Sequence, residues 1–145
     1  MAIQTALEDR TDDEVLAAGA TEISLQDARA LVRLFAEVTT SQDVDAFVSG
    51  FTEECVVHFA PAPLIHGREA LRHHMATFFT SQRRGFVCKK SLRALNGNVL
   101  GVTWTNRWTD ASTGKAMGSY GTEFWILRGN LIARWDAASA AFPVD

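Results

Sequence analysis

The sequence contains little of what marks the more specialised classes of protein. It has only two cysteines, Cys55 and Cys88, which lie in apolar or strand-like runs without CxxC spacing and are predicted to be buried free thiols. No apolar run approaches the roughly 18 residues that a membrane helix needs. With 14 Lys and Arg residues against 17 Asp and Glu residues, the net charge is −3 and the basic residues are scattered. We therefore expect neither nucleic acid nor a membrane as a partner.

The motifs of the common cofactor and metal sites are also missing from the sequence. There is no glycine-rich phosphate loop, no GxGxxG element and no serine-centred nucleophile elbow. The four histidines, His58, His66, His73 and His74, match no zinc spacing, because a helical zinc pair needs an i,i+4 interval and the last two are adjacent. We expect no metal and no cofactor. The acidic N-terminal stretch is not a signal peptide, so cytoplasmic residence is the default expectation.

What remains is the composition of one ordinary globular domain. Apolar residues make up 47% of the 145 residues and charged residues 21%. Residues 1–22 lack a sustained apolar period and are predicted to be a loosely ordered lead-in. A single domain is expected over residues 23–145.

Apolar side chains at helical spacing predict three helices in the first part of this domain. The first is expected at 25–39, after a capping Ser24, and the second over 44–51. The third opens at Gly67, with an acidic residue in its first turn. The β-branched run 55–59 predicts a strand between the second and third helices.

Beyond Gly85 the apolar period changes from helical spacing to two. Four long strands are predicted, at 86–95, 98–110, 115–128 and 131–141. The turns between them are too short for crossover helices, so the strands should form an antiparallel meander. The order of elements predicts an α+β fold with its helices on one face of the sheet.

From about Ser24 to Phe142 the chain resembles the SnoaL-like branch of the nuclear transport factor 2-like superfamily. The motifs that carry the resemblance are Asp43–Phe47, Glu54–Phe59, Gly67–Leu71 and the closing hairpin Phe124–Ile132. The resemblance implies a cone-shaped, curved, mostly antiparallel sheet wrapped around three helices, with one apolar pocket on its concave face. It also implies a fold that hosts isomerases, dehydratases, epoxide hydrolases, polyketide cyclases and plain binding modules.

Within this resemblance His58 is the sharpest catalytic candidate. Its interval to Gly67 places it where the related ketosteroid isomerases keep their general base, and an imidazole can transfer a proton at neutral pH. The same register puts Leu34 and Thr122 where those enzymes hold their two oxyanion donors, which argues against steroid isomerase chemistry. The alternatives are a buried neutral imidazole bonded to a backbone carbonyl group or to Tyr120, and an imidazole that only orients a ligand.

Strand alternation selects the other side chains expected to face the pocket. They are Trp104, Asn106 and Trp108 from one strand, Tyr120, Thr122 and Phe124 from the next, Trp135 from the last, and His74 from the third helix. This aromatic row favours a flat, hydrophobic or cyclic ligand, although aromatic residues at period two also occur as plain core. His58 and His74 together could serve an elimination similar to that of scytalone dehydratase.

The opposite, convex face is expected to be structural. Glu123 and Arg107 should form a cross-strand pair there, while the direction of Lys90 stays open. Bulk such as Trp125 on this face predicts a covering second copy, so we expect a homodimer.

Two functions remain open. One is a cofactor-free isomerase, dehydratase or cyclase that acts on a small hydrophobic or cyclic molecule, with His58 as general base. The other is a non-catalytic small-molecule-binding or dimerisation module.

Overall fold

The computed structural model describes residues 22–81 and 83–145, so nearly all of the expected lead-in, 1–22, lies outside the described residues. The helices are α3 (Leu25–Ser41), α4 (Val44–Ser49) and α5 (Arg68–Thr80), and the strands are β1 (Phe51–Ala60), β2 (Ile65–His66), β3 (Arg83–Asn96), β4 (Val99–Asp110), β5 (Ala116–Arg128) and β6 (Leu131–Pro143). The predicted helices and strands are confirmed, with some ends displaced by a few residues. In the described part of the chain, no helix is both long and apolar enough to span a membrane.

Local hydrogen bonds explain where the first two helices begin. The Ser24 side chain accepts a hydrogen bond from the Asp27 amide at 3.0 Å, and the Asp43 carboxylate accepts one from the Ala46 amide at 3.0 Å. Both are N-caps of the kind that satisfies the unpaired amides of a first turn. Between the two helices, Gln42 adopts a left-handed conformation with φ of 58°, which ends α3.

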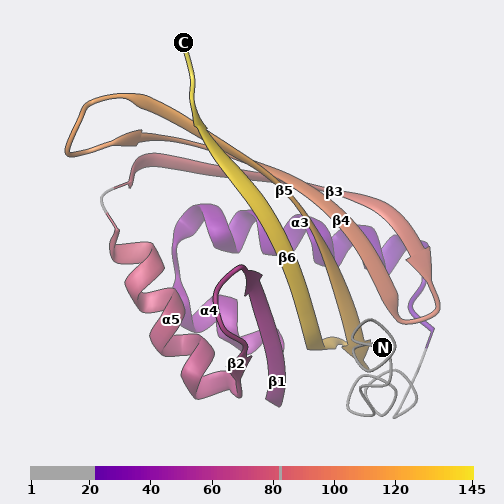
Figure 1. Cartoon of the computed structure of the whole chain (residues 1–145). Helices are drawn as coiled ribbons and strands as arrows, with labels where there is room; N and C mark the ends of the chain where they lie inside the picture. Colours follow the sequence, from indigo (N-terminus) through magenta and orange to yellow (C-terminus); the bar gives the residue numbers. More distant parts are fainter. Residues whose placement is uncertain (1–21, 82) are drawn as a thin grey trace, which may run out of the picture.

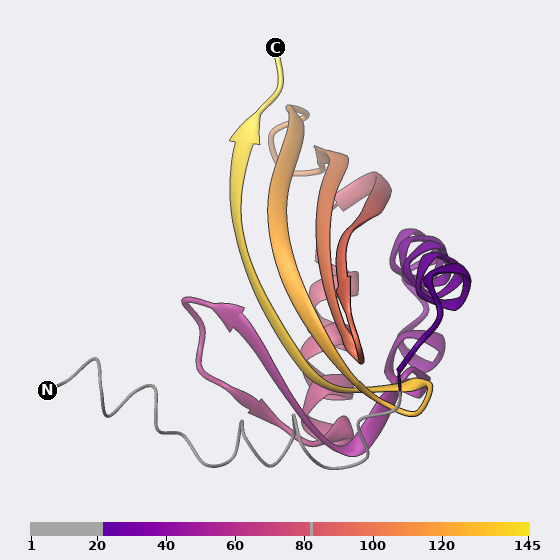
Figure 2. The same ribbon diagram turned by 90° about the vertical axis from the view of Figure 1, so that its right-hand side faces the viewer.

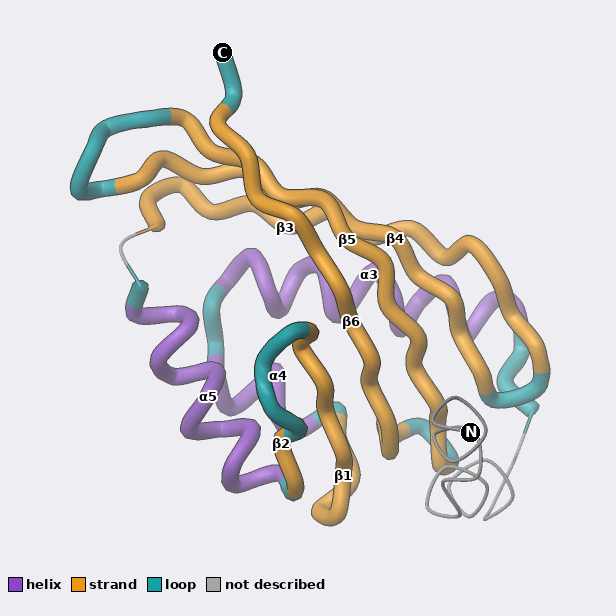
Figure 3. Tube along the Cα trace, in the orientation of Figure 1, coloured by secondary structure: helices purple, strands orange, loops and turns teal. Residues whose placement is uncertain are grey.

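The six strands form one sheet in the order β2-β1-β6-β5-β4-β3. The predicted meander is confirmed, because β3, β4, β5 and β6 pair antiparallel in succession. β1 joins β6 in parallel, and the short β2 lies antiparallel to β1 at the edge. All three helices lie on one side of the sheet (Figure 1 and Figure 3), and the long strands curve around that side (Figure 2). The fold is therefore an α+β cone with an open, curved sheet.

The core fills the space between the concave face and the helices. The buried stripe of α3 includes Ala28, Val32 and Phe35, as its spacing predicts. The Phe35 ring lies 5.0 Å from the Trp125 ring, which stacks on Trp135 at 4.8 Å with an angle of 28° between the planes. Trp125 is thus fully buried on the concave face, and its predicted contribution to the convex face is wrong.

Candidate functional site

A small cavity lies between the concave face of the sheet and helices α4 and α5. Its volume is about 170 Å³. Its walls are mainly apolar and aromatic, with a few polar side chains; they are formed by Thr39, Phe47, Phe59, Ala60, His74, Met75, Phe78, Cys88, Lys90, Trp104, Asn106, Glu123, Trp135, Ala137 and Ser139. A concave, mostly apolar site with few polar groups is the usual form of a small-molecule site.

A buried ion pair forms part of this wall. Lys90 Nζ on β3 donates a hydrogen bond to Glu123 Oε1 on β5 at 2.6 Å, and the two side chains are only 4% and 2% exposed. The pair reaches across the intervening strand β4, where Lys90 is the register partner of Trp104 and Glu123 that of Val102. Two charges this deeply buried are stable only when each neutralises the other. The open question about Lys90 is therefore answered: its side chain points inward.

Three tryptophans surround the ammonium group of this pair. Lys90 Nζ lies 5.6 Å from the Trp104 ring, 5.8 Å from the Trp125 ring and 5.0 Å from the Trp135 ring. At these distances the negative faces of the rings attract the cation. The indoles thus help to hold the lysine in place while excluding water from it.

The same burial changes the acidity of the carboxyl group. Desolvation raises the pKa of Glu123 above its ordinary value, while the Lys90 ammonium and the indole N–H groups of Trp125 and Trp104 lower it. Within the described chain neither indole completes a hydrogen bond of normal geometry, so their effect is weaker than that of the lysine. Desolvation dominates, so Glu123 accepts a proton more readily than an exposed glutamate. A buried group with a raised pKa in a cleft is a candidate acid or base.

His74 on α5 contributes a second polar group to the cavity, as predicted. Its ring stacks on Phe59, with the ring centres 5.2 Å apart and the planes at 19°. Burial lowers the pKa of His74 below its ordinary value, which keeps the ring neutral at pH 7.

Among the described residues, three that line the cavity carry buried polar atoms without a partner: Asn106, Trp135 and Trp104, whose indole N–H acts on the Glu123 carboxylate. Among the residues that the structure describes, none forms a hydrogen bond with Asn106 Oδ1 or with Trp135 Nε1. Both side chains line the cavity. An unpaired buried group of this kind is rare in proteins, because it has lost its hydration without gaining a partner.

The structure brings together four of the residues predicted for the site: His74, Trp104, Asn106 and Trp135. Trp108 lies on the same face of β4 but farther along the strand, where its ring is 6.3 Å from that of Phe86. It therefore does not line the cavity.

The predicted inward direction of Tyr120, Thr122 and Phe124 is wrong. Tyr120 is 51% exposed and Phe124 57% exposed, because β5 turns the alternate residues inward, Glu123 among them. A shift of one residue in a strand reverses every side chain on it. The hydrophobic pattern is misleading here, since Tyr120 and Phe124 face outward and the Glu123 carboxylate faces the core.

The predicted pair of Glu123 and Arg107 is wrong for the same reason. Glu123 binds Lys90 on the concave face, whereas the Arg107 guanidinium lies 5.5 Å from the Phe142 ring centre on the opposite face. Glu123 and Lys90 are thus the site residues whose partnership sequence reasoning missed. The available signal was that an inward lysine requires a partner, and Glu123 is 33 positions away in the chain.

His58 also lies on the convex face, so its predicted place in the pocket is wrong. Its side chain is 36% exposed, and Nδ1 lies 3.9 Å from Asp136 Oδ1, its register partner on β6. Arg134 donates to the same Asp136 carboxylate at 2.9 Å. On β1 it is Phe59, the next residue, that reaches the cavity. His58 is therefore too far around the strand to act as a base on a molecule bound inside.

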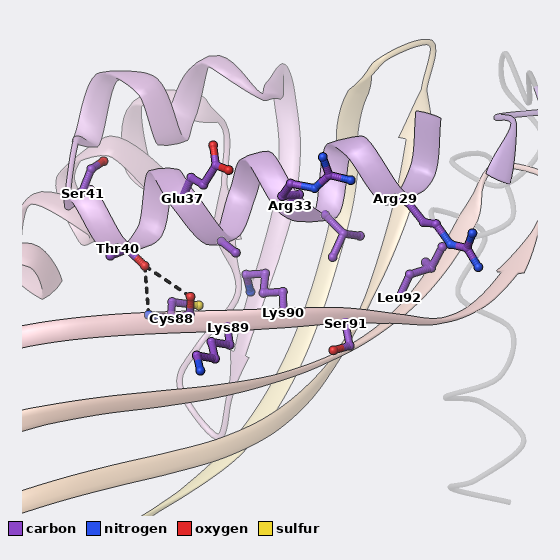
Figure 4. A pocket seen from close by; sticks show the side chains of 12 residues that line it. Arg29, Arg33, Glu37, Thr40, Ser41, Cys88, Lys89, Lys90, Ser91 and Leu92 are labelled. Atoms are coloured by element: carbon purple, nitrogen blue, oxygen red, sulfur yellow. Dashed lines mark hydrogen bonds between the residues drawn. The ribbon is translucent and has the colours of Figure 1, made fainter. Parts of the chain in front are cut away.

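A second, larger hollow lies outside the cone, between α3 and the edge strand β3. This groove has a volume of about 780 Å³ and carries Arg29, Arg33 and Lys89 along its sides (Figure 4). At one end the Thr40 hydroxyl accepts a hydrogen bond from the Cys88 amide at 3.0 Å and donates one to the Cys88 carbonyl at 3.3 Å. We take the inner cavity as the candidate site, because Glu123, the carboxylate of the buried ion pair, and the unpaired polar atoms of Asn106 and Trp135 lie in its wall.

Comparison with known proteins agrees with this architecture. A family model described as a SnoaL-like domain matches residues 31–135. A comparison with curated proteins finds no match.

Several solved structures share the fold at low sequence identity. The epoxide hydrolase/cyclase-like enzyme SalBIII, from pyran ring formation in the polyether salinomycin, is 17% identical over 82% of this chain and 97% of its own, with a TM-score of 0.70. A ketosteroid isomerase-like protein from Erwinia carotovora atroseptica is 17% identical over 79% and 95%, with a TM-score of 0.64. An LEH-like epoxide hydrolase from M. tuberculosis is 10% identical over 79% and 84%, with a TM-score of 0.62.

Proposed function

Since this chain belongs to the SnoaL-like family of the nuclear transport factor 2-like superfamily, we propose that it is a cofactor-independent isomerase, dehydratase or cyclase. Its substrate is a small, largely apolar cyclic molecule bound in the inner cavity, and Glu123 is the acid–base group in place of His58. The observation that carries this proposal is the Glu123 carboxylate, 2% exposed in the cavity wall and bound by Lys90 at 2.6 Å.

The ion pair suits proton transfer because it keeps the total charge of the site constant. When the Glu123 carboxylate takes a proton from a neutral substrate, the negative charge passes from the carboxylate to the substrate. The Lys90 ammonium then remains as the counter-ion of the substrate anion, in a place where water cannot stabilise that charge. Glu123 returns the proton at another atom, which completes an isomerisation, or to a leaving group, which completes an elimination.

The other polar residues of the cavity have supporting roles in this scheme. His74, which is neutral, and Asn106 orient the substrate by hydrogen bonding rather than by charge. The names of two neighbours, an epoxide hydrolase/cyclase-like enzyme and an epoxide hydrolase, lend support, because ring opening and ring closure also require a positioned acid or base.

The second candidate is a binding module without catalysis. It is favoured by one observation, namely that Lys90 and Glu123 already neutralise each other and could simply hold three strands in register. In that case the carboxylate would orient a guest molecule and never exchange a proton with it.

We also propose that a second copy of the chain covers the convex face, so that the protein is a homodimer. The proposal is supported by the exposed apolar side chains of this face, among them Tyr120 and Phe124 on β5 and Phe142 on β6. Exposed apolar surface of this kind is common at interfaces between subunits.

Deuterium exchange tests the catalytic proposal without knowledge of the natural substrate. Small cyclic ketones are incubated with the protein in heavy water, and deuterium uptake next to the carbonyl group is followed by NMR. The wild-type chain should accelerate uptake, and Glu123→Gln should reduce the acceleration by about 100-fold or more. Glutamine can still accept the Lys90 hydrogen bond, and circular dichroism verifies the fold.

Glu54→Gln is the matched control, because Glu54 is exposed on β1 outside the cavity and should leave the exchange rate unchanged. Exchange that persists in Glu123→Gln contradicts the assignment of the base. A wild-type chain that binds the ketones but never accelerates exchange favours the binding module.

A further inference from the structure

We infer that the cavity takes a neutral, single-ring molecule that carries a hydroxyl group, bound where Asn106 Oδ1 and Trp135 Nε1 lie buried and unpaired. This substrate class deepens the proposed function and rests on it, in that the inner cavity is taken as the ligand site. Four properties of the cavity lead to it: size, wall chemistry, charge and unpaired polar atoms.

The size of the cavity admits one ring. At about 170 Å³ it is close to the apolar cavity of about 150 Å³ that holds benzene in another protein. Two of its walls are held firmly in place. The Trp104 ring lies over Gly121, where a Cβ atom would overlap the indole, and Trp135 is stacked on Trp125 at 4.8 Å. A second fused ring would have to displace one of these indoles.

The walls favour a ring rather than a chain. Aromatic side chains surround the cavity on several sides: Phe47, Phe59, Phe78, Trp104 and Trp135. Flat rings contact such walls by stacking and by edge-to-face packing, with centres about 4.5–7 Å apart.

The charges of the cavity favour a neutral guest. Of the described residues that line it, Lys90 and Glu123 are bound to each other, and His74 is kept neutral by burial. A charged ligand would lose its hydration without meeting an unpaired opposite charge, which is strongly unfavourable.

The unpaired atoms favour a hydroxyl group. Within the described residues, the Asn106 carbonyl oxygen lacks a donor and the Trp135 indole N–H lacks an acceptor. A hydroxyl group can donate to the first and accept from the second, whereas a carbonyl or an ether oxygen can only accept. If the amide oxygen and nitrogen of Asn106 exchange places, the hydroxyl group can accept a hydrogen bond from the amide NH₂ instead.

A panel of four probes tests the inference by calorimetric titration of the wild-type chain. Phenol and toluene have the same shape and differ in the hydroxyl group, benzoate adds a charge, and 2-naphthol adds a ring. Phenol should bind about tenfold more tightly than toluene, the value of one hydrogen bond. Benzoate and 2-naphthol should bind more weakly than phenol.

Asn106→Leu should remove the preference for phenol while leaving the affinity for toluene unchanged, which makes toluene the internal control. Asn96→Leu, at an exposed position near the end of β3, should leave both affinities unchanged. Should Asn106→Leu fail to fold, the wild-type panel still decides.

Equal affinity for toluene and phenol, or tighter binding of benzoate or 2-naphthol, overturns the substrate class. These results are separate from the test of the proposed function. Selective phenol binding without any deuterium exchange supports the ligand class and contradicts catalysis. Deuterium exchange on ketones without a preference for phenol supports catalysis and contradicts the ligand class.

Discussion

Replacing Lys90 by methionine tests whether the buried pair governs the electrostatics of the core. Methionine fills much of the space of the lysine stem and removes its charge, so that Glu123 remains buried among tryptophans without a counter-ion. The pKa of Glu123 is raised by burial even beside Lys90, which is one of the groups that lower it. In Lys90→Met the pKa should therefore rise further.

The sign of the pH dependence follows from this direction. A glutamate whose pKa is higher in the folded state than in the unfolded state is protonated preferentially when folded. The variant should therefore be most stable at acidic pH and lose stability as the pH rises above the unfolded pKa of about 4.3. The loss has a limit of about 1.4 kcal/mol per pH unit, so the penalty should be at most about 1 kcal/mol at pH 5 and at most about 4 kcal/mol at pH 7. The larger value lies in the range of about 3–5 kcal/mol for breaking a buried ion pair.

Urea denaturation at several values between about pH 5 and about pH 8 measures these stabilities. The double variant Lys90→Met, Glu123→Gln is the matched control, because it lacks both charges and should not titrate in this range. The difference in unfolding free energy between the single and double variants isolates the carboxyl group. A difference that does not change with pH would refute the reasoning, since the buried carboxylate would then be free of the desolvation assigned to it.

Two further predictions concern the walls of the cavity and the convex face. Gly121→Ala should destabilise the fold by about 1–3 kcal/mol and weaken phenol binding, because the added Cβ would overlap the Trp104 indole. The control Thr122→Ala, at the exposed neighbouring position, should change the stability by less than about 0.5 kcal/mol. Equal urea midpoints for the two variants would contradict the packing argument. Phe124→Asp on the convex face should convert the homodimer to a monomer, as measured by light scattering, whereas Lys115→Asp in an exposed turn should leave the dimer intact. A dimer mass that is unchanged in Phe124→Asp would show that the convex face is not the interface.

The architecture was predictable because its signals are local. Ser24 and Asp43 cap the helices through residues three positions away, and the short turns of the meander leave the chain no room for crossovers. Element order and strand pairing then follow from chain geometry. The motif order was sufficient for the family resemblance, which the family model over residues 31–135 confirms.

The site was predictable only in part, because its chemistry depends on strand parity. On β4, Trp104 and Asn106 alternate with polar residues, so the inward face was evident. On β1 the run Cys55–Phe59 contains apolar residues at both parities, so alternation does not show which side chains face inward. The position of His58 therefore depends on alignment with the related isomerases, whereas in the structure the next residue, Phe59, lines the cavity. The pattern of apolar residues cannot reveal an error of one residue in such a run.

The inward face of β5 was predicted wrongly for a different reason. The rule that apolar residues face inward favours Tyr120 and Phe124 over Glu123, yet the carboxylate is buried because Lys90 compensates for its charge. Lys90 lies two strands away from Glu123, and the sequence around either residue gives no sign of the other. Pairings of this kind become visible only in three dimensions.

The parallel pairing of β1 with β6 links folding to the order of synthesis. β3, β4 and β5 each meet a neighbour across a short turn soon after emerging from the ribosome. β1 meets only the two-residue strand β2 early, and its other edge must wait for the final strand, β6. Until then the amino-terminal half has its apolar face exposed, and closing such a long loop slows the search for the native arrangement. Nascent chains that lack β6 should therefore be natural clients of chaperones.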